Sequence, residues 1–283
     1  MTVGPAPSPK GSSPQPKVLL LDLDDTLYRN HKVPAIVKER IQAYMVQKLG
    51  IPAEEVAAKT LELYLGHGTT LAGLVASGHK IDYHDWHEFV HHGALNYEEL
   101  LQPDPSLRDI LMSIDLPKYI LTNADKEHAE RCLARMGLSD CFQGMFYFEN
   151  VMELAAANGF DTAHAVLCKP NPRIYTLVCE VLGVSPSEVL FFDDSTRNVA
   201  GAHGLGARTV LVGADKPCPG ADLAIPTMHH LPAAMPQLMD TPGLVHEASH
   251  HSSQSQSGAG GLPDAVGAAA GPSGSGTAIS VPA

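Results

Sequence analysis

The chain has 283 residues, of which 44% are hydrophobic and 18% are charged, as is typical of globular proteins. Its formal net charge of −12 argues against binding a nucleic-acid polymer or an anionic membrane surface, because both require clusters of Lys and Arg. No run approaches the about 18 apolar residues of a membrane-spanning helix, so we expect no membrane partner. The five cysteines form no C-x-x-C pair and are typical of free thiols in a reducing compartment; we expect a cytoplasmic protein, with a plastid location left open.

Both ends of the sequence are low in complexity. The first 16 residues are rich in Pro, Ser and Gly, and residues 241–283 contain no aromatic side chain with which to build a core. We therefore predict a disordered leader over 1–16 and a disordered tail over 241–283. His246, His250 and His251 lie in that tail, where a flexible segment gives a metal ion no fixed geometry, so we predict no site there.

The first apolar run, at 17–23, predicts a strand that is buried on both faces. It runs directly into the carboxylates of Asp22, Asp24 and Asp25. Like charges at about 4 Å repel one another by roughly 4 kcal/mol per pair at an effective dielectric of about 20. A buried strand that ends on such a cluster indicates that its end holds a cation and carries chemistry.

Residues 30–105 contain no good strand and predict a helical insertion. Pro34 begins a helical pattern that ends at Gly50, and Pro52 begins another. Residues 68–78 and 82–92 are further helical candidates. A crossover between parallel strands needs only about a dozen residues. We therefore expect this segment to form a helical cap over the end of the first strand.

One helical stretch of the insertion carries His84, His87 and His91 on one face, at i, i+3 and i+7. No cysteine lies nearby and the acidic cluster lies elsewhere, so the pattern favours a solvated or interfacial face over a metal site. Trp86, the only tryptophan, is predicted to lie in the core of the insertion.

Strand-like runs then alternate with helical patterns. Further strands are predicted at 118–122, 145–148, 189–192, 208–212 and 222–225, and helices at 125–136 and 172–182. This alternation predicts an α/β fold with a doubly wound parallel sheet. Its catalytic core would comprise residues 17–29 and 106–240.

The glycines Gly201, Gly204 and Gly206 imitate a dinucleotide-binding fingerprint. They follow a helix and precede a strand, which is the wrong order for such a site. We therefore interpret them as helix-end glycines.

Polar residues follow three of the predicted strands. Thr122 and Asn123 follow the second strand, and Asp193 and Asp194 follow the fourth; Lys169 precedes the helix before the fourth strand. Ligands of open parallel sheets bind beyond the carboxyl ends of the strands, so these residues should meet the first carboxylates there. Clustered carboxylates need a cation, and hard oxygen ligands select Mg²⁺.

The stretches DLDDTLY, ILTNA, Lys169-Pro170 and FFDDS resemble, in this order, the four motifs of the haloacid dehalogenase superfamily. The insertion resembles that superfamily's cap. Over residues 17–240, with stretches such as KIDYHDWHEFVH and CKPNPRIY, the chain is most similar to the pyrimidine 5′-nucleotidase branch in plant- or alga-like form. Asp25 is a mild departure, because many relatives have Asn there.

The resemblance implies a Mg²⁺-dependent phosphomonoesterase acting on pyrimidine nucleoside 5′-monophosphates such as UMP or CMP. It implies that Asp22 is the nucleophile that forms an aspartyl-phosphate and that Asp24 is the general acid and base. Lys169 would offset the negative charge that gathers at the phosphoryl group, contributing to the rate and little to stability.

The resemblance also implies the binding residues. Asp22, the Asp24 carbonyl, Asp193 and Asp194 would hold Mg²⁺, with Asp194 as the more direct ligand of the last two. Thr122 with the Asn123 amide would bind a phosphoryl oxygen. Apart from the resemblance, the polar stretch with Thr69 and Thr70 interrupts the apolar pattern of the insertion. It would contact the substrate, or else form a turn in which one of the two threonines caps a helix.

Further activities stay open at this point. The substrate could be another small phosphorylated metabolite or a lysophospholipid, the phosphoryl group could pass to a second hydroxyl as in a mutase, and a non-catalytic scaffold of the same fold is a remote possibility. Dehalogenation is disfavoured, because it needs neither the second acid nor a metal. The expected partner is a small phosphomonoester, and the sequence leaves the oligomeric state open.

Overall fold

The computed structural model describes residues 15–239. The predictions for the tail, including its three histidines, and for nearly all of the leader lie outside the described residues. Within residues 15–239 no helix is long and apolar enough to cross a membrane.

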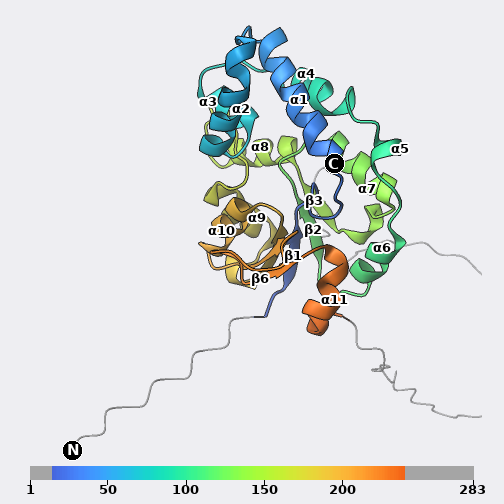
Figure 1. Cartoon of the computed structure of the whole chain (residues 1–283). Coiled ribbons are helices and arrows are strands. Elements are labelled where there is room, and N and C mark those ends of the chain that lie inside the picture. The colour runs from blue at the N-terminus through green and yellow to red at the C-terminus, as the bar shows by residue number, and fades with distance from the viewer. Residues whose placement is uncertain (1–14, 240–283) are drawn as a thin grey trace, which may run out of the picture. The chain divides into compact units, whose positions relative to one another are not determined.

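A six-stranded parallel sheet forms the centre of the fold (Figure 1). Its strand order is β3-β2-β1-β4-β5-β6, and all five pairings are parallel. The strands are β1 (Val18–Leu21), β2 (Lys118–Leu121), β3 (Gly144–Phe146), β4 (Val189–Asp193), β5 (Arg208–Val212) and β6 (Leu223–Ile225). The predicted α/β doubly wound sheet is confirmed. Its order reverses between β1 and β4, which is where ligands bind in such sheets.

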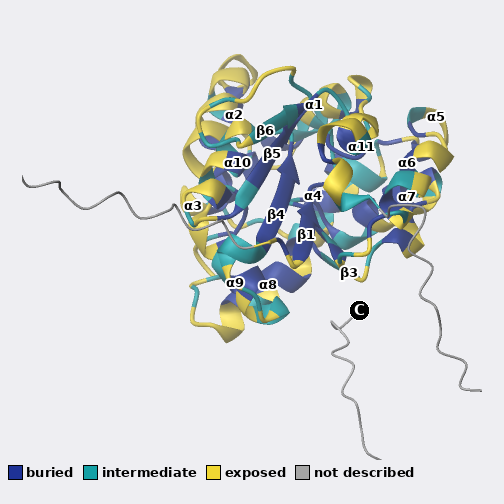
Figure 2. Cartoon of the chain, turned by 90° about the horizontal axis from the view of Figure 1, so that it is seen from below, coloured by how far each residue is buried: buried dark blue, intermediate teal, exposed yellow. Residues whose placement is uncertain are grey.

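Helices cover both faces of the sheet, and its central strands are buried (Figure 2). Successive residues of β1 face opposite sides: Leu20 joins one apolar cluster, whereas Leu19 and Leu21 join the other. The core helices are α6 (Pro105–Met112), α7 (Lys126–Met136), α8 (Phe148–Ala157), α9 (Pro172–Leu182), α10 (Thr196–His203) and α11 (Leu231–Ala234). Continuous apolar runs thus became strands buried on both faces, as the sequence predicts.

Two local predictions need correction. The third strand ends at Phe146 rather than at residue 148, because Tyr147 caps α8 and Phe148 is already helical. Of the three glycines near α10, Gly204 ends the helix and Gly206 has a φ of +96°, as predicted. Gly201, however, lies inside α10, where a Cβ would stand 2.8 Å from the carbonyl oxygen of Pro170.

The insertion between β1 and β2 is helical and lies beyond the end of β1 (Figure 1). It comprises α1 (Lys32–Gln47), α2 (Ala53–His67), α3 (Thr70–Ala76), α4 (Tyr83–His87), the π-helical turn η1 (Glu88–His92) and α5 (Tyr97–Leu100). Trp86 is buried and packs edge-on against Tyr44 at 4.9 Å between ring centroids, as expected of a core residue. One apolar cluster includes both insertion residues such as Met45 and sheet residues such as Phe191, so the insertion shares a core with the sheet.

The insertion approaches the core closely at Gly68. This glycine ends α2 with a φ of +94°, and a Cβ there would stand 2.5 Å from the carbonyl oxygen of Lys169. Because that neighbour is backbone, it cannot move aside without displacing the loop that carries Lys169. A residue without a Cβ is therefore required on geometric grounds.

We predict that Gly68→Ala destabilises the protein more than Gly50→Ala does. Gly50 also has a positive φ, of +67°, but nothing lies within 4 Å of its Cβ position, so it controls for conformational strain. That strain costs about 1–2 kcal/mol for an L-residue, and only Gly68→Ala adds a clash. Urea unfolding of both variants measures the difference, and equal losses would contradict the close approach.

Candidate active site

A buried lysine lies between two carboxylates at the carboxyl edge of the sheet. The Nζ atom of Lys169 donates to Asp22 Oδ1 at 2.6 Å and to Asp193 Oδ2 at 2.7 Å. Lys169 is 1% exposed, Asp22 6% and Asp193 0%. Asp22 continues the end of β1, and its N–H donates to Phe192 O of β4 at 2.9 Å. The expectation that Lys169 adds little to stability therefore does not fit its burial in an ion-paired network.

Negative charge is in excess around this lysine. Burial raises the pKa of the Asp22 carboxyl well above its usual range; Lys169 acts in the opposite direction, and the charges of Asp193 and Asp194 add to the rise. Burial and the charge of Asp193 also raise the pKa of Asp194, to about 7. One oxygen from each of Asp22, Asp193 and Asp194 lies within 4.8 Å of the others. The donor set is all carboxylate oxygen, which fits a hard divalent cation.

The neighbours Asp193 and Asp194 have different surroundings. Asp193 Oδ1 accepts from Ser195 N at 2.8 Å and from Asn198 Nδ2 at 2.9 Å, while its Oδ2 accepts from Lys169. The half-buried Asp194 carboxylate accepts no hydrogen bond from a side chain among the described residues, and the donor beside it is its own main-chain N–H. Asp193 is thus committed to orienting Lys169, whereas Asp194 is open to a further ligand.

Thr122 and Asn123 follow β2, and Asn123 contacts the loop that carries Lys169. Thr122 is buried, and its Oγ1 accepts from Ala124 N at 3.0 Å. Asn123 Oδ1 accepts from Lys169 N at 2.8 Å, and Asn123 Nδ2 donates to Lys169 O at 3.1 Å. The Asn123 side chain therefore fixes the main chain of Lys169. The group of Asn123 that would bind a ligand is then its main-chain N–H.

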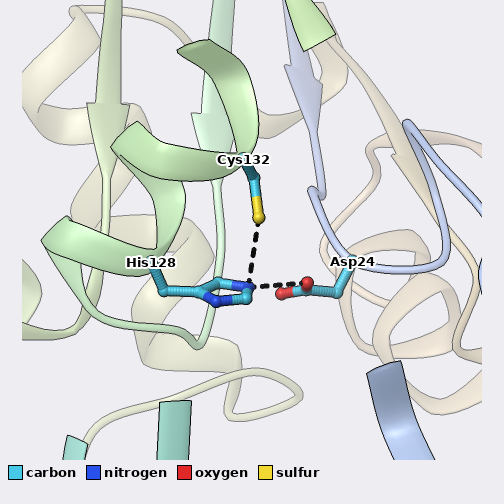
Figure 3. Close-up of side chains that lie close together, drawn as sticks. All are labelled: Asp24, His128 and Cys132. Atoms are coloured by element: carbon cyan, nitrogen blue, oxygen red, sulfur yellow. Dashed lines mark hydrogen bonds and ion pairs between the residues drawn. The ribbon is translucent and has the colours of Figure 1, made fainter. Parts of the chain in front are cut away.

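Asp24 is hydrogen-bonded to residues that the sequence analysis did not identify. Its Oδ1 accepts from His128 Nε2 at 2.8 Å and from the Tyr28 hydroxyl, and Cys132 Sγ lies 3.5 Å from the same imidazole nitrogen (Figure 3). The other ring nitrogen of His128 lies 2.9 Å from the Tyr97 hydroxyl. The position of His128 on the apolar face of the helix predicted at 125–136 was the only signal that could have indicated it.

Asp24 and His128 shift each other's pKa in opposite directions. Burial alone would raise the pKa of Asp24, but the charge and hydrogen bond of His128 bring it to about 2. Conversely, burial lowers the pKa of His128, and the Asp24 carboxylate more than reverses this, so that it lies well above its usual range. The pair thus holds one proton, on His128, over the neutral pH range.

A pocket of about 170 Å³ opens beside Asp24. The loop after β1, helix α1, the π-helical turn and α7 contribute its walls, which consist of Asp24, Asp25, Tyr28, Val33, Pro34, Val37, His91 and His128. Its lining combines three aliphatic side chains with five polar ones. A group attached to a phosphate at Asp22 would find this pocket next to the proposed acid.

Of the two threonines predicted to contact substrate, neither points clearly to that role. Thr69 caps α3 by accepting from Ala72 N at 3.1 Å, and its hydroxyl lies 3.9 Å from Cys168 Sγ, next to Lys169 in the chain. Thr70 is buried and donates to Thr60 O at 3.4 Å within the insertion. The predicted helix cap is therefore observed for Thr69, and Thr70 has no exposed surface to offer a ligand.

The three histidines of the insertion do not share one environment. His84 is exposed, whereas His87 and His91 are largely enclosed between the insertion and α7. The predicted solvated surroundings are thus found only for His84, and the predicted interfacial surroundings are found for His87 and His91. The helical periodicity could not distinguish these cases, because it does not report which element packs against the face.

A family model described as haloacid dehalogenase-like hydrolase matches residues 16–206. The chain is 27% identical over 216 residues to phosphate metabolism protein 8 of Saccharomyces cerevisiae, which covers 72% of this chain and 64% of that protein.

Two bacterial relatives match shorter regions. The chain is 34% identical over 107 residues to an (S)-2-haloacid dehalogenase of Xanthobacter autotrophicus, which is 38% of this chain and 37% of that protein. It is 28% identical over 133 residues to a phosphoglycolate phosphatase of Chromobacterium violaceum, which is 45% of this chain and 54% of that protein. The chain thus spans less than two thirds of the length of each of these relatives. With two thirds of its own length matched by the family model, the chain belongs to the haloacid dehalogenase-like hydrolases.

Proposed function

We propose that this hydrolase is a Mg²⁺-dependent phosphomonoesterase that cleaves pyrimidine nucleoside 5′-monophosphates, such as UMP and CMP, through an aspartyl-phosphate. The observation that carries the proposal is the buried Lys169 between Asp22 and Asp193, with the Asp194 carboxylate beside them. A phosphate dianion that meets a carboxylate nucleophile brings two negative groups together, so the site must supply positive charge. Two of the relatives have names that refer to phosphate chemistry.

The carboxylates fit a magnesium ion. Asp22, Asp194 and the main-chain carbonyl of Asp24 would hold it, with Asp193 adjacent and already bonded to Lys169. Burial and the neighbouring carboxylates raise the pKa values of Asp22 and Asp194, and a bound cation would favour their ionised forms. When bound, the ion would supply charge that offsets that of the phosphoryl oxygens and the nucleophile.

In the proposed reaction, an Asp22 carboxylate oxygen attacks phosphorus and the bond to the leaving oxygen breaks. Asp24 gives a proton to that oxygen, which departs as the nucleoside hydroxyl. Asp24 then takes a proton from water, which attacks the aspartyl-phosphate and releases phosphate and the Asp22 carboxylate. Thr122 and the Asn123 N–H would bind a non-bridging phosphoryl oxygen, and Lys169 would hold Asp22 in place and offset the gathered charge.

The His128–Asp24 pair offers a source for the first proton. The ionised form of Asp24 cannot act as an acid, but His128 donates to Asp24 Oδ1 at 2.8 Å. Transfer of that proton along the hydrogen bond would give the protonated carboxyl that the leaving group needs. The second step would return the proton to the pair.

The preference for a pyrimidine nucleotide rests on the resemblance of the insertion and on the pocket beside Asp24. At about 170 Å³ this pocket is below the about 300–1,000 Å³ of sites that bury drug-sized ligands. A compact leaving group therefore fits better than the acyl chain of a lysophospholipid. A different small phosphorylated metabolite is the second candidate substrate, favoured by the phosphoglycolate phosphatase among the relatives.

Dehalogenation and a non-catalytic role both fit the site less well. One relative is a haloacid dehalogenase, but dehalogenation by an Asp nucleophile needs neither a second acid such as Asp24 nor a metal held by Asp193 and Asp194. A non-catalytic scaffold would not need Asp22, Asp24 and Lys169 to remain together at one edge of the sheet.

The first prediction is that Asp22→Asn abolishes turnover, because an amide does not attack phosphorus. Asp25→Asn is the matched control: it makes the same change three residues away, and the φ of +57° at Asp25 is one that Asn tolerates. We expect this control to retain activity. Phosphate release from UMP, with Mg²⁺ and with EDTA, measures both variants after their folding is checked by circular dichroism. Mg²⁺-dependent hydrolysis by a folded Asp22→Asn protein would exclude the covalent mechanism.

The second prediction is that Lys169→Met lowers both stability and activity. Removing one partner of a buried ion pair costs about 3–5 kcal/mol of unfolding free energy, measured without metal. In the presence of Mg²⁺, kcat should fall about 10²–10³-fold. Because the pKa of Asp22 is already raised, acid protonates its carboxyl and relieves the uncompensated negative charge. The loss in unfolding free energy should therefore be larger at pH 8 than at pH 5.

Urea unfolding in EDTA at the two pH values measures this loss. Lys48→Met is the control, since Lys48 forms an exposed pair with Asp85 at 3.0 Å and such pairs contribute about 1 kcal/mol or less. A loss for Lys169→Met that matches the control, or that shrinks as the pH rises, would contradict the account of the buried charges.

The third prediction is that UMP and CMP have the highest kcat/KM in a panel with AMP, GMP, phosphoglycolate and a lysophosphatidate at saturating Mg²⁺. A site that hydrogen-bonds its substrate rejects analogues without the matching groups by large factors. If phosphoglycolate or the lipid phosphate exceeds UMP by about tenfold or more, the nucleotide substrate is wrong while the phosphomonoesterase proposal stands.

A further inference from the structure

A cluster of imidazoles surrounds one buried carboxylate between the insertion and the core. Asp125 caps the N-terminus of α7, where its Oδ1 accepts from His128 N at 3.0 Å. From η1 of the insertion, His91 Nδ1 lies 2.7 Å from Asp125 Oδ2, and His92 Nε2 lies 2.6 Å from Asp125 Oδ1. The Asp125 side chain is 1% exposed. Both of its oxygens therefore face imidazoles, which come from a different part of the chain.

His87 lies against the same carboxylate but is not hydrogen-bonded. Its Nδ1 lies 3.3 Å from Asp125 Oδ2, yet neither ring nitrogen has a hydrogen-bond partner among the described residues. Its side chain is 5% exposed. A buried polar group without a partner is costly, typically by about 1–3 kcal/mol. The imidazole of His87 thus faces Asp125 with both ring nitrogens free of hydrogen bonds to the described residues.

The ligand atoms lie close enough together to bind one ion. One atom from each of His87, His91 and Asp125 lies within 4.8 Å of the others. Ligands at the usual zinc–nitrogen and zinc–oxygen distances stand ~3.3 Å apart at the corners of a tetrahedron. His87 Nδ1 and Asp125 Oδ2 have this separation. His91 Nδ1 lies closer to Asp125 Oδ2, at 2.7 Å, so this imidazole would exchange its hydrogen bond for the metal and move outward by ~0.6 Å.

His87 and His91 are four residues apart in the chain. His91 lies on η1, whose π-helical character is shown by the Gly93 N–H, which donates to Glu88 O at 2.8 Å. Turns of this kind often mark functional sites.

We propose that His87, His91 and Asp125 Oδ2 bind a zinc-class divalent ion that links the insertion to the core. His92 and the main-chain N–H of His128 would keep Asp125 Oδ1 in place, as partners of a metal-bound carboxylate commonly do. Water would occupy the fourth position. Two nitrogens and one oxygen distinguish this site from the all-oxygen set of Asp22, Asp193 and Asp194.

The test is a calorimetric titration of the full chain with Zn²⁺ in excess Mg²⁺. His246, His250 and His251 are changed to alanine in every sample, so that they cannot bind the ion. The variant is His87→Phe, which keeps an aromatic ring against Phe148, at 4.8 Å between centroids, and removes both ring nitrogens. The matched control is His84→Phe, on the same helix and exposed.

We expect the parent and His84→Phe proteins to bind one more Zn²⁺ than His87→Phe does, or to bind it at least ~10-fold more tightly. The thermal midpoint should rise with Zn²⁺ in the first two proteins only. Without Zn²⁺, His87→Phe should be at least as stable as the parent, because it loses no hydrogen bond. Equal Zn²⁺ binding by all three proteins would overturn the proposal.

A second measurement needs no substitution in the cluster. Co²⁺ added to the parent protein in excess Mg²⁺ should give the intense visible absorption of a four-coordinate site with nitrogen ligands, and Zn²⁺ should abolish it. Only the weak absorption of six-coordinate Co²⁺ would also overturn the proposal, whatever the folding of His87→Phe.

Discussion

The ammonium group of Lys169, enclosed between Asp22 and Asp193, is the interaction on which the rest of the site depends. A buried charge is tolerated only where its partners and their hydrogen bonds are fixed. The molecule fixes each of them from a different direction. Asn123 bonds both main-chain groups of Lys169, and Asn198 with the N–H of Ser195 holds Asp193.

Close backbone contacts complete that arrangement. Gly68 of the insertion and Gly201 of α10 both approach the Lys169–Pro170 loop so closely that a Cβ would collide with its carbonyl oxygens. The loop is thus held between the insertion on one side and a core helix on the other. Positions that look like ordinary turn glycines in the sequence are therefore part of what places the lysine.

The sequence predicted the sheet well and the site in part. Continuous apolar runs and Gly or Pro boundaries are local signals, so β4, β5 and α9 lie at or within one residue of the predicted bounds. The run at 145–148 failed because an apolar tetrapeptide does not reveal where a strand gives way to a helix. Asp22, Thr122 and Asp193 were predicted to meet because the ends of parallel strands meet at one edge.

One partner that completes the site was beyond reach of local patterns. Lys169 is 147 positions from Asp22 and was predicted from the sheet edge and from the order of the motifs. His128 is 104 positions from Asp24 and belongs to none of these motifs. A histidine in an amphipathic helix is usually a packing residue, and what changes its role is the tertiary contact alone, which no propensity reports.

The polar residues at this edge form two systems with opposite electrostatic character. Around Lys169 the carboxylates outnumber the cation, which leaves room for a hard metal ion. Around Asp24 and Asp125 the imidazoles outnumber the carboxylates, and both acids stay ionised despite burial. The rings of His91 and His128, 4.8 Å apart, connect the two carboxylates of the second system.

This connection couples the position of the insertion to the proposed acid. His91 comes from the insertion, whereas His128 is hydrogen-bonded to Asp24 and stands on the helix that Asp125 caps. Any displacement of the insertion therefore changes the charge and packing next to the hydrogen bond of Asp24. The insertion thus does more than cover the end of β1: through these histidines it contributes to the environment in which Asp24 would exchange its proton.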